Sequence, residues 1–213
     1  MSLRKKEILM FLVVYHFLQF VLCFAIRPPF IYFQTLNNSS QNSRLEPTFV
    51  SSQDWGVVLA LNNTPKLKNP VPYVIFYQTN TEECRNRTQF SEIVLRIQKM
   101  RLMLMNDDIQ YNFLVGGGIG GLVYVARDWD TTSGVNNGYN RRSIGIGLIG
   151  TFFSKLIPDT LIRTAINLIE FGTKNGKINE CAHYISIPPM AFIVQHVDEV
   201  MKKFMEKFDY SHS

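Results

Sequence analysis

Residues 108–129 read DIQYNFLVGGGIGGLVYVARDW, and this stretch decides the fold. Gly116, Gly118 and Gly121 match G-x-G-x-x-G, the fingerprint of a dinucleotide-binding turn. Such a turn needs a helix after the glycines, so that the pyrophosphate lies over the helix N-terminus. Here residues 122–125 are Leu, Val, Tyr and Val, which are typical of a strand. The stretch therefore predicts a β-hairpin with a glycine-rich tip and excludes a nucleotide site.

Further strands and helices are expected on both sides of this hairpin. Continuous apolar runs indicate buried strands, and apolar residues spaced three and four apart indicate amphipathic helices. The expected elements are strands over 71–79, 109–115, 122–129 and 143–152 and helices over 90–104, 158–176 and 196–208. Ser91 is a candidate cap for the first helix. Alternation of the two kinds of element predicts an α/β fold, a sheet flanked by helices.

Composition and charge narrow the class of partner. The chain has 213 residues, of which 46% are apolar, enough for one domain with a sizeable core. The net charge is +5, and Arg4, Lys5 and Lys6 supply part of it. The remaining excess is too mild to predict a nucleic-acid partner, which usually requires a clustered basic face.

The N-terminus predicts a secretory or membrane location. An apolar run over residues 8–26 follows Arg4, Lys5 and Lys6, and its 19 residues would span roughly 28 Å as a helix. Two interpretations stay open. The run is a signal-anchor of a single-pass membrane protein with an extracellular C-terminal domain, or a signal peptide cleaved near Ala25 from a secreted protein. The expected organisation is this segment over 1–26, a polar stalk or linker over 27–53, and a compact domain over 54–213.

Asparagine sequons and cysteines fit that compartment. Asn-x-Ser/Thr triplets make glycosylation candidates of Asn37, Asn38, Asn62 and Asn86. Outside the apolar run the chain has two cysteines, Cys84 and Cys181, far apart in sequence. Nothing local supports a bond between them, so we expect unpaired or intermolecular thiols.

The order of these segments resembles a peptidoglycan recognition protein domain. The resemblance covers about residues 54–210 and rests on DWG at 54–56, PVPYVIFYQT at 70–79, DIQYNFLVG at 108–116, GLVYVARDW at 121–129 and GYNRRSIGIGLIGTF at 138–152. It implies the amidase-type-2 fold, a central mixed β-sheet flanked by about three helices. The apolar run over residues 8–26 adds an expected N-terminal hydrophobic helix. The departures described next are similar to those of a non-catalytic, insect long-form branch of the family.

The resemblance also implies where a zinc ion would bind in catalytic members, which cleave the amide between muramic acid and L-alanine. The three ligand positions fall on Tyr77, Pro189 and Val197. A neutral phenol, with a pKa near ~10, is a poor zinc ligand, and proline and valine side chains offer no donor atom. We therefore expect no metal, no other cofactor and no enzyme activity.

Four polar residues match positions of the family's ligand cleft: Thr79, Tyr111, Arg127 and Asn140. Other positions depart from the pattern, among them Phe90, which stands where the family has the disulfide partner of Cys84. The expected function is a non-catalytic regulator of innate immune signalling that acts through related immune receptors or signalling proteins. A weak muramyl-peptide sensor or decoy is the alternative, with peptidoglycan fragments as ligand. A zinc N-acetylmuramoyl-L-alanine amidase is the remote alternative.

Overall fold

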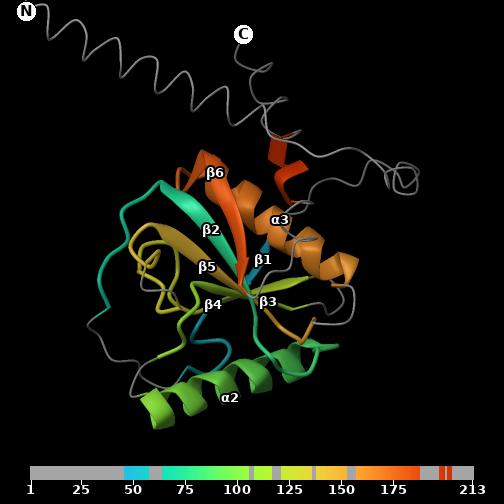
Figure 1. Cartoon of the computed structure of the whole chain (residues 1–213). Helices are drawn as coiled ribbons and strands as arrows, with labels where there is room; N and C mark the ends of the chain where they lie inside the picture. The colour runs from blue at the N-terminus through green and yellow to red at the C-terminus, as the bar shows by residue number, and fades with distance from the viewer. Residues whose placement is uncertain are drawn as a thin grey trace, which may run out of the picture. The chain divides into compact units, whose positions relative to one another are not determined.

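The computed structural model describes residues 46–57, 64–105, 108–116, 121–135, 138–152, 157–187, 197–199 and 201–202. These residues form one sheet with helices packed on it (Figure 1). In chain order the elements are β1 (Thr48–Val50), β2 (Val71–Gln78), α2 (Arg87–Met105), β3 (Phe113–Gly116), β4 (Leu122–Val125), β5 (Ser143–Leu148), α3 (Asp159–Lys174) and β6 (Ile178–Ile187). The predicted N-terminal segment 1–26 lies outside the described residues. None of the helices in the described residues has both the length and the hydrophobicity of a membrane-spanning segment.

The sheet is mixed and has six strands in the order β1-β4-β3-β5-β2-β6. Among the strands that the structure describes, β3 and β4 are the one antiparallel pair, and Gly116 pairs with Leu122 at its end. The prediction of a hairpin around the glycine run is therefore confirmed, although its tip, residues 117–120, lies outside the described residues. The other neighbouring strands are parallel, which requires helical or long connections between them.

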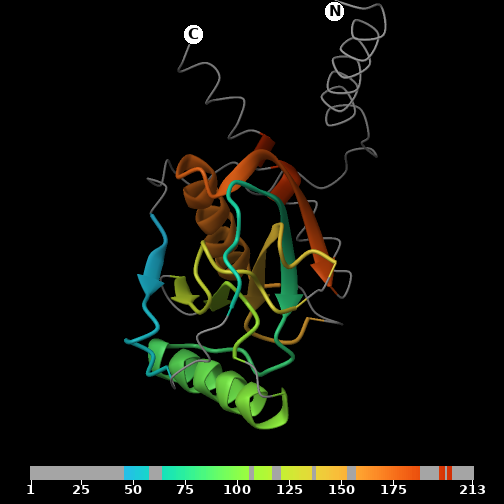
Figure 2. The same ribbon diagram turned by 90° about the vertical axis from the view of Figure 1, so that its left-hand side faces the viewer.

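The sheet is covered on both faces, by α3 on one and α2 on the other (Figure 1, Figure 2). Alternation along each strand divides the side chains between two cores. In β2, Phe76 joins the core under α3, whereas Ile75 and Tyr77 join the core under α2. In β5 every second residue, including Ile144 and Ile146, packs under α3. The opposite side of β5 carries glycines, which matters for the site below.

The α2 helix begins earlier than the apolar spacing predicted. Its first residue is Arg87, and the cap is Asn86, whose Oδ1 accepts a hydrogen bond from the backbone N–H of Gln89 at 2.9 Å. Gln89 in turn accepts the backbone N–H of Arg85 at 3.0 Å through Oε1. The expected cap, Ser91, is instead bonded to the Tyr124 hydroxyl at 2.9 Å. The apolar periodicity missed this turn because capping side chains are polar.

Two strands were not predicted from periodicity. β1 lies inside the segment 27–53 that was predicted to be a linker, so the compact domain begins before residue 54. Three residues are too few to show a period of two, and β1 is recognisable only through its parallel pairing with β4. Trp55 follows it and donates from Nε1 to the Val125 carbonyl at 2.9 Å. β6 was not predicted because its side chains are mostly exposed or half-buried, without a clear alternation of apolar and polar residues.

Cys84 is a buried thiol, and Cys181 is an exposed thiol. Cys84 and Phe90 lie together against the backbone of Gly116. A Cβ on Gly116 would stand 2.5 Å from the Phe90 ring and 2.8 Å from the Cys84 Sγ. The phenyl ring therefore fills the space beside Cys84 with apolar packing, and glycine is required where β3 passes it.

Candidate functional site

Tyr77 and Tyr111, two of the residues singled out from sequence, pack on the α2 side of strands β5, β2 and β6, called here the β5–β2–β6 face. Residues paired between parallel strands share a face, so the register sets out rows across it. The rows are Ser143–Tyr73–His183, Gly145–Ile75–Ile185 and Gly147–Tyr77–Ile187. Glycine occupies the β5 position in two rows out of three, which leaves room there for large rings from neighbouring segments.

Two tyrosines fill that room. The Tyr111 ring lies directly on Gly147, where an added Cβ would be 3.1 Å from the Tyr111 Cγ. Tyr77 leans toward Gly145, with its Cε2 3.7 Å from the corresponding Cβ position. The two ring centroids are 5.8 Å apart. Tyr77 is only 5% exposed and Tyr111 only 8%. This part of the face is therefore packed with aromatic carbon.

Burial also fixes the protonation state of these two phenols. The pKa of Tyr77 is raised well above its ordinary value of 10.0, first by burial and then by the neighbouring Tyr111. Burial likewise raises the pKa of Tyr111, against smaller opposing effects of a hydrogen bond to Gln110 and the charge of Arg101. Both side chains are neutral phenols at physiological pH, and neither supplies a phenolate oxygen.

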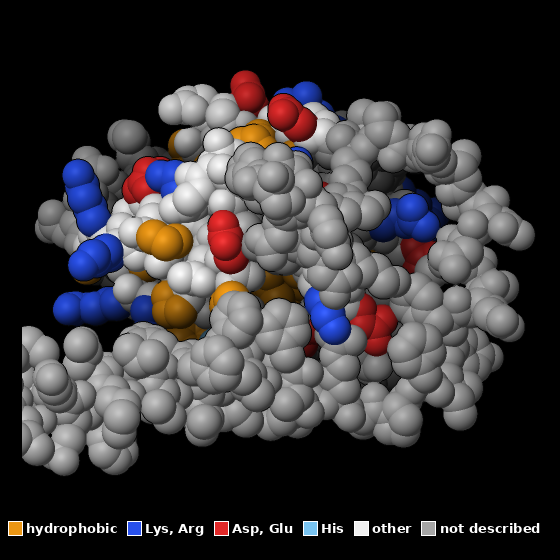
Figure 3. All heavy atoms as spheres, turned by 90° about the horizontal axis from the view of Figure 1, so that it is seen from above, with side chains coloured by type: hydrophobic (Ala, Val, Ile, Leu, Met, Phe, Trp, Pro, Cys, Tyr) orange, Lys and Arg blue, Asp and Glu red, His pale blue; other side chains and the backbone are white. Residues whose placement is uncertain are grey.

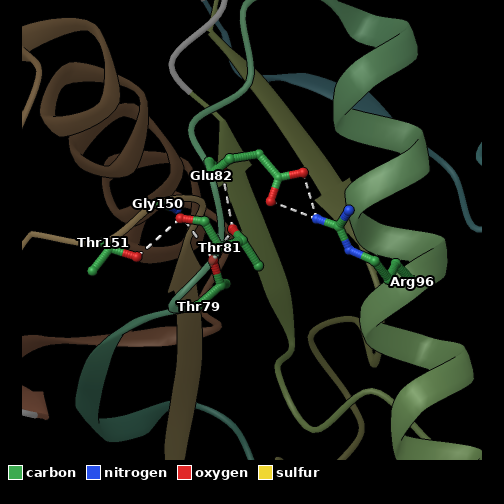
Figure 4. Close-up of polar contacts among 6 residues, drawn as sticks. All are labelled: Thr79, Thr81, Glu82, Arg96, Gly150 and Thr151. Carbon is green, nitrogen blue, oxygen red and sulfur yellow. Dashed lines mark hydrogen bonds and ion pairs between the residues drawn. The ribbon is translucent and has the colours of Figure 1, made fainter.

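Thr79 lies just beyond β2 and joins the ends of two strands (Figure 4). Its Oγ1 accepts the backbone N–H of Gly150 at 3.1 Å and is hydrogen-bonded to the Thr81 hydroxyl at 2.8 Å. Thr151 donates from its hydroxyl to the Thr81 carbonyl at 2.9 Å. The predicted ligand residue Thr79 is thus a structural link between the segments that follow β2 and β5.

An exposed ion pair continues from this link to α2 (Figure 4). The Arg96 guanidinium donates to both carboxylate oxygens of Glu82, at 2.5 and 2.6 Å. The hydrogen bond from Arg96 lowers the pKa of Glu82, although both side chains remain exposed. A pair so accessible to water contributes little to stability, and its geometric effect is to connect the loop after β2 to the helix.

Arg127 and Asn140 both contact the segment around residues 132–134. Arg127 donates from Nε to the Ile109 carbonyl at 2.6 Å and from Nη1 to the Thr132 carbonyl at 3.1 Å. Asn140 accepts the Ser133 hydroxyl on Oδ1 at 3.1 Å. Since Arg127 also donates its backbone N–H to the Tyr111 carbonyl, the structure brings three of the four predicted residues around one loop. Thr79 lies apart from them, at the end of β2.

Asn112 organises this loop and was not singled out from sequence. It is fully buried, and its Nδ2 donates to the carbonyls of Asp128 at 2.8 Å and Thr131 at 2.7 Å. Its Oδ1 accepts the backbone N–H of Gly145 at 2.8 Å. The one available signal was a polar side chain beside the apolar run that forms β3. All of the hydrogen-bonding groups that Asn112 satisfies are distant in sequence, so the role itself could not be inferred.

Two half-buried tyrosine rings, an exposed arginine and an exposed histidine lie at the Ser143–Tyr73–His183 row. Tyr73 and Tyr139 meet edge to face, 5.0 Å between centroids, and the Arg142 guanidinium carbon is 5.2 Å from each ring centroid. The exposed His183 ring is tilted against Tyr73 at 5.5 Å. Seen from above the molecule, several Lys and Arg side chains project at one edge of the described surface beside hydrophobic side chains, and others are spread over the rest of this view (Figure 3).

The positions expected for zinc ligands do not all fall in the described part. Pro189 lies outside the described residues, and Val197 is fully buried in the core under α3. Among the residues that the structure describes, no three His, Cys, Asp or Glu side chains are grouped so that they could hold a metal ion.

Comparison with known proteins gives consistent relatives. The family described as N-acetylmuramoyl-L-alanine amidase matches residues 67–206. Peptidoglycan-recognition protein 1 of Holotrichia diomphalia is 31% identical over 158 residues, which are 73% of this chain and 78% of the relative. Peptidoglycan-recognition protein 2 of the same beetle is 32% identical over 135 residues, 63% of this chain and 71% of the relative.

Solved structures agree with these relatives. Peptidoglycan recognition protein-LE, in complex with tracheal cytotoxin, a monomeric diaminopimelic acid-type peptidoglycan, superposes with a TM-score of 0.62 at 29% identity, covering 65% of this chain and 81% of that one. PGRP-SA of a bumblebee has a TM-score of 0.62 at 33% identity, covering 66% of this chain and 83% of that one. The predicted mixed sheet flanked by helices is confirmed.

Proposed function

The chain belongs to the N-acetylmuramoyl-L-alanine amidase family as a peptidoglycan recognition protein, and from that premise we propose that it recognises partners without cleaving peptidoglycan. In this proposal it is a non-catalytic regulator of innate immune signalling. The observation that carries it is Tyr77, a buried neutral phenol at the position where the resemblance implies the first zinc ligand.

The residues at the implied metal positions do not suit zinc. Zn²⁺ is held by imidazole, thiolate or carboxylate donors, with an open position for the catalytic water. Tyr77 would have to lose a proton that its burial makes harder to remove, and Val197 turns an apolar side chain into the core. The third position is Pro189, whose ring carries no donor. We therefore derive no reaction step through a metal.

Metal analysis of the purified full chain tests this point. The protein is equilibrated with zinc, dialysed, and measured for bound metal beside a catalytic family member treated in the same way. We expect zinc far below one ion per chain. Stoichiometric zinc that survives dialysis would overturn the proposal, since it would require a ligand set other than these residues.

Protein partners are the second element of the proposal. Among the structural relatives, the ectodomains of PGRP-LCa and PGRP-LCx form a complex with tracheal cytotoxin bound to it, and this chain is 29% identical to the matched chain. That complex supports the idea that domains of this kind associate with one another. We propose that the partners of this chain are related immune receptors or signalling proteins. The domain would meet them outside the cell, anchored by residues 8–26 or released by cleavage near Ala25.

Binding of a muramyl peptide is the second candidate function. It is favoured by the presence of Thr79, Tyr111, Arg127 and Asn140 and by the ligand held in the PGRP-LE structure. Against strong binding, Thr79 and Arg127 already form hydrogen bonds within the domain. Retention on insoluble peptidoglycan distinguishes the two functions. Retention that soluble muramyl peptide competes away would establish a sensor or decoy, whereas no retention supports action through protein partners alone.

A further inference from the structure

The sequon Asn86-Arg87-Thr88 lies at the first turn of α2, and all three of its residues are exposed. Exposure of the whole triplet means that a bulky group on Asn86 would extend into solvent and displace no packed side chain. Asn86 itself is not part of the helix, which begins at the next residue. A modification there would leave the backbone hydrogen bonds of the helix in place.

The carboxamide of Asn86 has two ends with separate roles. Its Oδ1 caps the helix by accepting the backbone N–H of Gln89 at 2.9 Å. The cap requires an acceptor oxygen only, and the Nδ2 atom contributes nothing to it. Because an N-glycosidic bond forms at Nδ2 and retains the carbonyl oxygen, a glycosylated Asn86 would still cap α2.

We propose that Asn86 carries an N-linked oligosaccharide, an inference that rests on the secretory location proposed above. The sugar donor is an oligosaccharide linked to a lipid diphosphate. Nδ2 loses a proton and forms a bond to the anomeric carbon, the bond between that carbon and the diphosphate oxygen breaks, and the lipid diphosphate leaves. The reaction needs no oxidant or reductant.

A glycan at this position has a consequence for recognition. It would stand over the first turn of α2, where Arg87, Thr88 and Gln89 are exposed, close in sequence to the accessible Glu82–Arg96 pair. A protein partner could not pack closely on that turn. Docking surfaces for protein partners are therefore to be sought away from the N-terminal end of α2.

Translation of the full chain in the presence of microsomes tests the proposal. Asn37, Asn38 and Asn62 are replaced by Gln, so that Asn86 is the one remaining sequon asparagine. We expect the protein band to migrate more slowly by a single step, and an endoglycosidase should remove this step. Asn86→Asp and Thr88→Ala should each lose the step. Asn86→Asp keeps the helix cap because aspartate caps as well as asparagine, and Thr88→Ser keeps both the sequon and the step.

Protease protection in the same reactions tests the secretory location separately from the glycosylation of Asn86. If the domain is protected inside the microsomes and no endoglycosidase-sensitive step appears, the assignment of Asn86 is wrong although the location is right. If protease digests the domain, the secretory location and the glycan fail together. A step that persists in Asn86→Asp would show that the sugar is attached elsewhere, which also overturns the proposal.

Discussion

The rings of Tyr77 and Tyr111 pack against each other with centroids 5.8 Å apart and planes 50° apart, over the two glycines of β5. This contact occupies the part of the β5–β2–β6 face where the resemblance implies a metal ligand. Both rings are buried, so the contact is part of the core under α2. These side chains are therefore part of the packing that stabilises the domain, and the non-catalytic function proposed above rests on the same contact.

Alkaline pH is expected to destabilise the domain through these two phenols. Their pKa values are raised in the folded state, so above the ordinary value of 10.0 the unfolded chain loses protons that the folded chain retains. Stability is therefore unaffected by these groups below about pH 10 and falls as the pH rises beyond it. Urea denaturation between pH 8 and 11 measures the slope. Tyr77→Phe should reduce this slope, because it removes one of the two phenols whose pKa burial raises. An unchanged slope in this variant would contradict the role given to Tyr77.

Removal of the Asn112 carboxamide should destabilise the fold strongly. Asn112→Ala leaves the part-buried carbonyls of Asp128 and Thr131 and the buried N–H of Gly145 without their partner, which should cost roughly 2–4 kcal/mol of unfolding free energy. Denaturant titration measures the loss. Asn175→Ala is the matched control, because its side chain makes one exposed hydrogen bond to the Phe171 carbonyl, and it should change stability by about 0.5 kcal/mol or less. Equal effects of the two substitutions would refute the role given to Asn112.

The cap of α2 predicts a difference between two substitutions at Asn86. In unglycosylated protein, Asn86→Ala should lower the unfolding free energy by about 1 kcal/mol, since the N–H of Gln89 loses its acceptor. Asn86→Asp should have almost no effect. Thermal and chemical unfolding of the two variants, made without the secretory pathway, provides the comparison. A similar loss of unfolding free energy in Asn86→Ala and Asn86→Asp would show that the Asn86 carboxamide stabilises the protein by some means other than capping α2.

Gly116 should not tolerate a side chain. In Gly116→Ala the new methyl would meet the Phe90 ring and the Cys84 Sγ at distances no packed carbon adopts, and we expect a loss of about 1–3 kcal/mol. Cys84→Ala removes the Sγ atom, one of the three atoms that obstruct the new methyl, so the double variant should be less destabilised than the sum of the single variants. A double-mutant cycle by denaturant titration measures this coupling. Simple additivity would contradict the packing of Cys84 against β3.

Much of the fold could be predicted from the sequence because its central elements have strong local patterns. The apolar run of β2, the punctuated helix α3 between Pro158 and Gly176, and the strand character of residues 122–125 each carry their own signal. β1 and β6 have no such local pattern, because they are held in the sheet by pairing with strands far away in the sequence. The start of α2 was missed for a related reason: Asn86 and Gln89 are polar, and periodicity counts only apolar positions.

The candidate site, like the fold, could be predicted from the sequence only in part. The resemblance to the family, and not periodicity, assigned Tyr77, Thr79 and Tyr111 to one region. The structure packs Tyr77 against Tyr111, whereas Thr79 lies at the end of β2. The sequence could not predict that Thr79 and Arg127 form hydrogen bonds to backbone groups, since their partners Gly150, Ile109 and Thr132 are brought near only by folding. Asn112 was missed because its role depends on three such distant groups.

Hydrolysis of peptidoglycan tests the proposed lack of amidase activity most directly. The full chain, purified in detergent and supplied with zinc, is incubated with soluble peptidoglycan beside a catalytic family member. Free L-alanine amino groups on the released stem peptides are then measured. Since Tyr77 replaces the implied first ligand, the account predicts release no greater than in buffer, at any zinc concentration. Release that depends on zinc and stops on chelation would contradict it.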